Sequence, residues 1–382
     1  MKAKSIKGNS SEEISKSLID SMADGFTPTL AIVFMSIKQD RIAICDLLDK
    51  SGIAIFGSTS SGEFIDGEIG KESTVIMLMD INRSYFKILF EECAERNTCE
   101  IAKAVGETGL KTFSHPAFMV ACDGFSDNAE LIIQGIEDAV GGDADIFGGM
   151  AGDDLTATGT FVFTNKNVTD NGLVALIIDK DKIKISGLAT HGWQPVGTIR
   201  TVTKSEGNVI YTVDGEPALD IFMKYMGIAV TPDSYHDLKY NFGDYYPIQL
   251  VKDNAPSIMR ETRAINTTDR SIMFSAGVPQ GSKFRFSLPP DWEIIDKIKE
   301  DCYELKKEEQ SEADAVIVFS CASRPWSFGS MINKEVEEIN TVWESPMIGF
   351  FTYGEIGKSG IGKNELHNNT CMIVVLKENN LP

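Results

Sequence analysis

A short pattern that occurs three times is the feature that most restricts how these 382 residues can fold. Each copy has an apolar run, a helix-like segment, a second apolar run, a glycine-rich loop with a carboxylate, and a third apolar run. The copies cover residues 30–79, 117–178 and 315–376. Short apolar runs bounded by turn residues are typical of buried strands. The pattern predicts an α/β fold, with α+β as the alternative, whose mixed β-sheets are built from recurring strand-helix-strand-strand units.

The third copy carries polar side chains at the ends of its expected strands. A helix over residues 332–343 separates the first strand from the second, and the loop after the second strand holds Glu355. If that helix is a right-handed crossover, the two strands are parallel and their carboxyl ends meet at one edge of the sheet. The strand over residues 371–376 begins at the same edge if it runs antiparallel. We therefore expect Arg324, Glu355 and His367 to converge.

Polar residues at this edge are candidates for ligand contacts. A guanidinium group can grip a carboxylate with two parallel hydrogen bonds, so we expect Arg324 to pair with a ligand carboxylate and Glu355 with an ammonium group. In the alternative, Arg324 and Glu355 bind each other and brace the loops, or a glutamate only caps backbone N–H groups. The candidates are Cys321, Arg324, Glu355, His367, Asn368, Thr370 and, at the matching position of the first copy, Glu63.

The charge of the chain argues against two classes of partner. It has 36 basic and 56 acidic residues, a net charge of −20. Nucleic acids and anionic membranes attract positive surfaces, so neither is expected as the main partner. Seven cysteines without a Cys-x-x-Cys pair fit a reducing cytoplasm. The four histidines are scattered and lack metal-binding spacing, so no metal site and no cofactor are expected.

Two other functional classes compete with ligand binding. Cys321 could act as the nucleophile of a hydrolase with Glu355 and His367, but a cysteine at the end of an apolar strand is more often a buried structural thiol. The glycine-rich loop over residues 57–62 has no lysine in the spacing of a phosphate-binding loop. The chain could also be a protein-interaction module without a small ligand.

Several stretches together resemble the FIST family, an intracellular sensory module of bacteria and archaea that has an N-terminal and a C-terminal part. No single stretch is specific, but all of them keep the order of the family along the chain. They are residues 57–63, 146–153, 191–197, 202–218, 319–324, 349–355 and 367–370.

The resemblance implies a two-part architecture, with a FIST-N-like domain over residues 28–222 and a FIST-C-like domain over residues 223–378. It also implies a cytoplasmic signal-transduction protein that binds a small ligand, such as an amino acid or another small carboxylate. No output domain is expected in the chain itself. A separate signalling protein, such as a kinase or a chemoreceptor, is therefore the expected partner. Enzymatic activity is not the favoured hypothesis.

Overall fold

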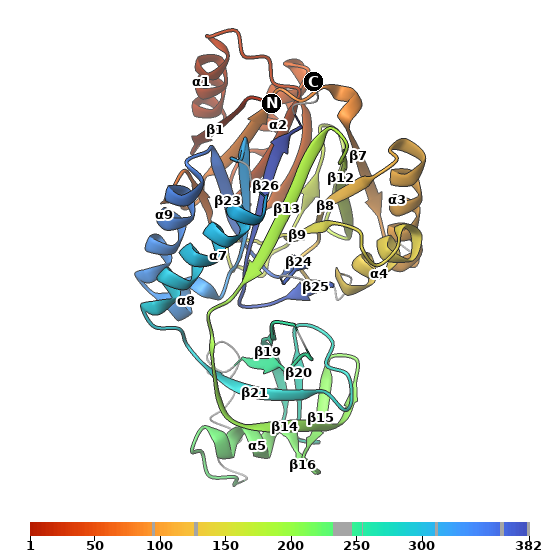
Figure 1. The fold of residues 1–382 in the computed structure, drawn as a ribbon, viewed down its shortest axis with the longest axis vertical. Helices are drawn as coiled ribbons and strands as arrows, with labels where there is room; N and C mark the ends of the chain where they lie inside the picture. The colour runs from red at the N-terminus through yellow and green to blue at the C-terminus, as the bar shows by residue number, and fades with distance from the viewer. Residues whose placement is uncertain are drawn as a thin grey trace.

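Three similar units form the body of the molecule, and a separate β domain is inserted into the third (Figure 1). Unit 1 spans residues 3–79, unit 2 spans residues 86–179, and unit 3 combines residues 183–190 with residues 293–378. The inserted domain spans residues 194–288. The computed structural model describes residues 1–93, 96–125, 129–231, 247–253, 255–309, 312–359 and 363–379.

The units share one order of elements. Unit 1 contains β1 (Ala3–Gly8), α1 (Ser11–Met22), β2 (Leu30–Met35), α2 (Arg41–Lys50), β3 (Ala54–Thr59), β4 (Glu63–Ile65), β5 (Glu68–Ile69) and β6 (Thr74–Met79). A 3-10 turn, η1 (Arg83–Tyr85), leads into unit 2. Unit 2 contains β7 (Phe86–Glu92), α3 (Thr98–Thr112), β8 (Pro116–Cys122), α4 (Ala129–Val140), β9 (Ile146–Met150), β10 (Val162–Phe163), β11 (Val168–Thr169) and β12 (Gly172–Asp179).

Unit 3 repeats this order, but the inserted domain separates its first strand from its first helix. The unit contains β13 (Ile183–Thr190), α7 (Glu293–Glu309), β22 (Ala315–Cys321), α8 (Arg324–Phe328), α9 (Met331–Trp343), β23 (Met347–Thr352), β24 (Glu355–Lys358), β25 (Asn364–His367) and β26 (Cys371–Glu378). The inserted domain contains β14 (Gln194–Glu206), β15 (Val209–Val213), β16 (Glu216–Pro217), α5 (Ala218–Tyr225), β17 (Ile248–Leu250), β18 (Ile258–Arg260), β19 (Thr262–Asn266), β20 (Ser271–Phe274) and β21 (Lys283–Leu288).

Strand pairing is the same in all three units. The second strand of each unit runs parallel to the third strand, as in β2 with β3, β8 with β9 and β22 with β23. It runs antiparallel to the last strand, which is β6, β12 or β26. The prediction that the first and third copies share one architecture is therefore confirmed. The first strand of each unit pairs with the outer side of the last strand.

Each unit also gives a hairpin to the sheet of another unit. The β4–β5 hairpin of unit 1 pairs with β23 of unit 3. The β24–β25 hairpin of unit 3 pairs with β9 of unit 2, and β10 of unit 2 pairs with β3 of unit 1. This exchange links the three sheets in a closed ring, so no unit completes its own sheet.

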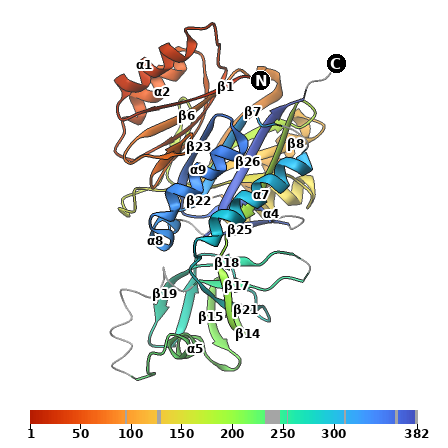
Figure 2. The ribbon, with the colours of Figure 1, turned by 60° about the vertical axis from the view of Figure 1, so that its left-hand side comes forward.

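The main core lies where the three sheets face one another. Phe34, Phe319 and Phe350 meet there, with a distance of 4.4 Å between the ring centroids of Phe34 and Phe350. Helices α1 and α2 cover the outer face of the first sheet, α3 and α4 cover the second, and α7 and α9 cover the third (Figures 1 and 2). Because both faces of each sheet are buried, the strands are continuously apolar and do not alternate.

Three glycines allow the exchanged hairpins to pack closely against the strands with which they pair. Gly57, Gly148 and Gly349 occupy the same register position on the third strand of their units. Each lies opposite an apolar residue of the incoming hairpin, which is Phe163 for Gly57 and Phe64 for Gly349. A Cβ atom on either of these two glycines would lie 2.2 Å from the facing ring. A larger residue there would push the hairpin off the sheet.

Some elements were not anticipated from the sequence. Helix α3 was missed because it packs through Gly106 and Gly109, residues that are usually read as helix breakers. The sequence also indicates Asp127 as an N-cap of α4 and a loop over residues 231–254, but Asp127 and most of that loop lie outside the described residues. The division of the sequence between residues 222 and 223 falls inside α5 and stays a prediction. No helix in the described ranges is long and apolar enough to cross a lipid bilayer.

The exchange predicts that Gly57→Ala destabilises the protein by about 1–3 kcal/mol, because the added methyl overpacks the contact with Phe163. Gly142→Ala is the matched control, since a Cβ there meets no atom within 4 Å, and we expect unchanged or slightly higher stability. Urea unfolding followed by circular dichroism measures both. Equal stability of the two variants would contradict the proposed packing role of Gly57.

Candidate functional site

The predicted site residues lie where β22 and β23 end and β26 begins. β22 and β23 are parallel, and β26 is antiparallel to β22. The backbone N–H of Cys321, the last residue of β22, donates to the carbonyl of Thr370 at 2.9 Å. The strands thus meet at one sheet edge, as the sequence predicted, and all of the candidate side chains are buried.

Glu355 keeps one carboxyl oxygen without a partner. Its Oε2 accepts a hydrogen bond from the backbone N–H of Thr370 at 3.3 Å. Its Oε1 is buried and has no hydrogen-bond partner among the described residues. Burial raises the pKa of Glu355 well above its usual range, although the bond from Thr370 and the charge of Arg324 oppose this shift. Burial thus favours the neutral form of this side chain, in which Oε1 can carry the proton and donate a hydrogen bond.

Glu63 occupies the same position in unit 1, but both of its oxygens are used. Glu63 lies opposite Phe350 in the exchanged hairpin, as Glu355 lies opposite Gly149. Oε1 of Glu63 accepts from Ser60 Oγ, and Oε2 accepts from the backbone N–H and the hydroxyl of Ser73 at 3.0 and 2.8 Å. Glu63 is thus a capping residue, the second of the two roles that its sequence position suggested.

The turn before β26 contains two buried asparagines with unused polar atoms. Asn368 has no hydrogen-bond partner for either Oδ1 or Nδ2, and Nδ2 of Asn369 also has none, within the part of the chain that the structure describes. Asn369 has a φ of 53°, a left-handed conformation that asparagine tolerates better than most residues. A buried polar group left unpaired costs about 1–3 kcal/mol. The protein thus maintains a costly arrangement around this turn.

A chain of side-chain contacts connects Glu355 to this turn. Cys321 is close enough to Glu355 to lower its pKa slightly against the larger effect of burial, and the Sγ of Cys321 lies 3.1 Å from Ser323 Oγ. Ser323 Oγ then donates to Asn369 Oδ1 at 2.7 Å. These contacts lead from Glu355 to Asn369, and Asn368 precedes Asn369 in the same turn; we call these residues the polar cluster. Asn369 was not singled out from the sequence, where nothing distinguished it from an ordinary turn residue.

His367 and Thr370 hold the hairpin and the turn in place. His367 Nε2 donates to the carbonyl of Gly357 at 3.1 Å, across the β24–β25 pair. Burial lowers the pKa of His367 to about 3, so the ring is neutral at pH 7. Thr370 Oγ1 donates to the carbonyl of Asn368 at 2.8 Å. Both side chains thus hold the backbone around the cluster by donating to main-chain carbonyls.

Arg324 is fully buried and binds Glu335, so the alternative that it bridges to Glu355 is wrong. Its Nε donates to Glu335 Oε1 at 3.3 Å, and its Nη2 donates to Glu335 Oε2. Its Nη1 donates to the carbonyls of His191 and Asn369 at 3.1 and 3.0 Å. Arg324 thus holds the backbone of the asparagine turn in place. Glu335 was missed because it lies on the buried face of α9 among apolar residues.

Burial and pairing reduce the charge of the groups around the cluster. Burial favours the protonated form of Glu355 and keeps His367 neutral, and Arg324 is compensated by Glu335. Glu261 of the inserted domain is close enough to raise the pKa values of Glu355 and Cys321 further, after the larger effect of burial. The inserted domain therefore lies against this edge of the sheet. Neutral donors and acceptors suit the recognition of a polar ligand by hydrogen bonds.

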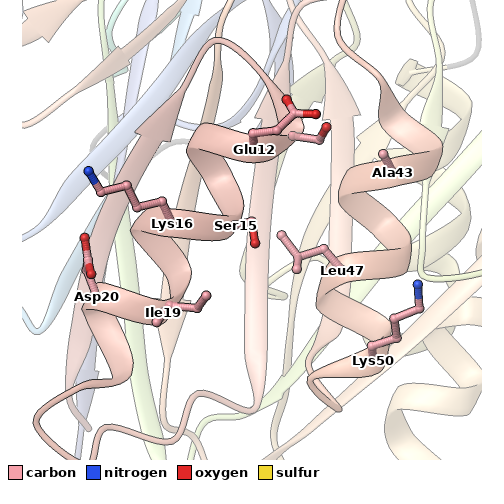
Figure 3. A pocket seen from close by; sticks show the side chains of 9 residues that line it. Glu12, Ser15, Lys16, Ile19, Asp20, Ala43, Leu47 and Lys50 are labelled. Carbon is pink, nitrogen blue, oxygen red and sulfur yellow. The ribbon is translucent and has the colours of Figure 1, made fainter.

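Two surface grooves lie away from these residues. A groove of about 550 Å³ runs between α1 and α2, with Ile19 and Leu47 facing the gap (Figure 3). A larger groove of about 920 Å³ follows β13. Neither is lined by any of the candidate residues.

Comparison with known proteins gives two matches to family models that together span most of the chain. The FIST N domain matches residues 29–216, and the FIST C domain matches residues 218–358. The uncharacterized protein MJ1623 of Methanocaldococcus jannaschii is 26% identical over 257 residues, which are 61% of this chain and 48% of that protein. The chain thus spans about half the length of this curated relative.

The bracing role of Arg324 predicts that Arg324→Met lowers the free energy of unfolding by about 3–5 kcal/mol, because Glu335 is left as an unpaired buried charge. The double variant Arg324→Met, Glu335→Leu should recover most of this loss. Arg96→Met is the control, since Arg96 pairs with Glu91 on the surface and should cost at most about 1 kcal/mol. A stable single variant would contradict the bracing role.

The environment of Cys321 predicts an unreactive thiol. Burial raises its pKa well above the usual range, and the thiolate is the nucleophilic form. Iodoacetamide should label the half-buried Cys99 in the native protein and reach Cys321 only after unfolding, as measured by peptide mass spectrometry. Labelling of native Cys321 faster than free cysteine at pH 7 would instead support the hydrolase alternative.

Proposed function

Since the chain belongs to the FIST family, whose domains are signal-transduction sensory domains, we propose that it senses a small ligand at the buried polar cluster of unit 3. The ligand contacts are Glu355, Asn368 and Asn369. Cys321, Thr370 and His367 complete the walls, Arg324 positions the asparagine turn, and Glu63 serves the same fold position in unit 1 without touching the ligand.

The contrast between Glu63 and Glu355 carries this proposal. The same fold position holds a glutamate in two units, and in unit 1 serines use both of its oxygens. In unit 3 the corresponding carboxyl keeps a free oxygen beside two asparagines that also have unused atoms. A purely structural role would favour the arrangement of unit 1, because unpaired buried groups lower stability.

The available atoms favour a small carboxylate or an amino acid. The protonated Oε1 of Glu355 and the amide N–H groups of Asn368 and Asn369 can donate to carboxylate oxygens, and Oδ1 of Asn368 can accept from an ammonium group. The guanidinium of Arg324 acts through the carbonyl of Asn369, to which it donates at 3.0 Å. Recognition by neutral donors avoids the cost of burying another unpaired charge in the protein.

The signal passes to a separate protein in the cytoplasm, such as a kinase or a chemoreceptor. With a net charge of −20, the chain is a poor match for nucleic acids or anionic membranes. Enzymatic turnover is not part of the proposal, because the thiol of Cys321 is held in its protonated form.

A thermal-shift screen of the twenty amino acids and of short carboxylates tests the site. A ligand that binds only the folded state raises the melting temperature. At a concentration of one hundred times its dissociation constant, it adds about 2.7 kcal/mol to the free energy of unfolding. Asn368→Leu should abolish this shift while leaving the ligand-free protein equally or more stable, because it removes unpaired polar atoms.

Asn165→Ala is the matched control. Asn165 bonds to the backbone of Ile55 and Ile53, far from the cluster in the fold, so its loss should lower stability but preserve the ligand-induced shift. A screen in which Asn368→Leu responds like the wild type would overturn the assignment of the site.

A further inference from the structure

The first strand of unit 3 has an unprotected edge. β13 pairs with β26 alone, and no backbone hydrogen bond joins its other side to another strand among the described residues. Edge strands present unpaired N–H and C=O groups, and proteins commonly protect such edges with charged residues. The equivalent strand β1 carries two lysines, and β7 carries a lysine and two glutamates. Lys184 is the only charged residue of β13.

A groove of about 920 Å³ runs along this edge. Residues 184–194 line it without interruption, α7 forms one wall, and Asp145 and Lys358 lie on the other side. Figure 1 shows β13 passing between α7 and the strands of unit 2. The middle of the strand, residues 186–188, is half-exposed. The groove is therefore extended along a free strand edge, which is the shape that an added strand requires.

The charges of the groove are not balanced along its two walls. Lys180 and Lys358 both bind Asp145, and Lys297 binds Asp301. On the α7 wall, three exposed carboxylates have no cationic partner among the described residues; they are Glu293, Glu304 and Glu308. The groove thus offers unpaired negative charge beside an unpaired backbone edge.

The inner end of the groove is connected to the ligand cluster. His191 lines the groove, and its carbonyl accepts from Arg324 Nη1, the same nitrogen that donates to the carbonyl of Asn369. One guanidinium nitrogen therefore joins the end of the groove to the asparagine turn.

We propose that this groove binds an extended segment of a partner protein that carries lysine or arginine at alternate positions and adds to the sheet as a strand beside β13. Main-chain hydrogen bonds to β13 supply affinity, and the carboxylates of α7 select the basic side chains on one face of the segment. Transmission of ligand binding to the groove through Arg324 rests on the proposed function, but the docking itself does not.

The test uses the full chain and a fluorescein-labelled peptide of eight residues, the length of β13, in which lysine and valine alternate. Fluorescence anisotropy should show binding, and hydrogen exchange should show slower exchange at residues 183–190. Glu304→Lys should weaken binding roughly threefold to tenfold, because one attraction becomes a repulsion. Glu300→Lys, one turn away on α7 and outside the groove, should leave binding unchanged.

A second peptide of the same charge, N-methylated at alternate residues, separates strand addition from simple charge attraction. It should bind at least tenfold more weakly, because it cannot form the ladder. Equal binding of the two peptides, or equal effects of the two lysine substitutions, would overturn the proposal. Concentration-dependent protection of β13 without peptide would also overturn it, by showing that a second copy of the chain occupies the edge.

The two proposals fail separately. Asn368→Leu, which should lose the response to small ligands, should still bind the basic peptide. Failure of the peptide to bind while the small-ligand response persists removes only the docking site.

Discussion

The exchange of hairpins among the three units is the constraint on which the rest of the structure depends. Each sheet needs a hairpin from another unit, so the three sheets form together and enclose one central core. The exchange also brings the loop after each third strand against a neighbouring unit. The backbone N–H of Gly152 donates to Thr59, that of Met150 to Gly354, and that of Ser61 to Phe351. Polar groups at the carboxyl edges of the sheets are thereby buried, which makes any unpaired group there costly.

The same fold position is used in three different ways. In unit 2 it is occupied by Val162, opposite Ser58, in unit 1 by the capped Glu63, and in unit 3 by Glu355 with its free oxygen. The position is therefore able to hold an apolar residue, a structural cap or a recognition group without any change in strand order. The polar cluster of unit 3 differs from its counterparts because some of its buried polar atoms have no hydrogen-bond partner among the described residues. The inserted β domain lies against this edge.

Much of the body could be predicted from the sequence, because buried strands with two covered faces are continuous apolar runs that need no partner to be recognised. The parallel pairing of β22 with β23 followed from one right-handed crossover, whereas the antiparallel direction of β26 was an assumption that the structure bears out. The exchange could not be predicted, since a short hairpin such as residues 63–69 has the same pattern whichever sheet it joins. The position of Glu355 at the sheet edge was predicted, but Glu335 was not found as the partner of Arg324, because a buried acid between apolar helix positions looks like a solvent-facing one. Whether the side-chain atoms of Asn368 and Asn369 find hydrogen-bond partners depends on tertiary packing, which no local sequence pattern indicates.

The central claim is that Glu355 is a buried, protonated acid whose free oxygen receives the ligand, and infrared spectroscopy of its carboxyl group tests this most directly. At pH 7 the wild-type protein should show a protonated carboxyl band that Glu355→Gln lacks and that Glu63→Gln retains. The band should shift when the ligand with the largest thermal response is added. A spectrum in which Glu355→Gln removes only an ionised carboxylate band, or in which the protonated band does not move on ligand binding, would contradict the account.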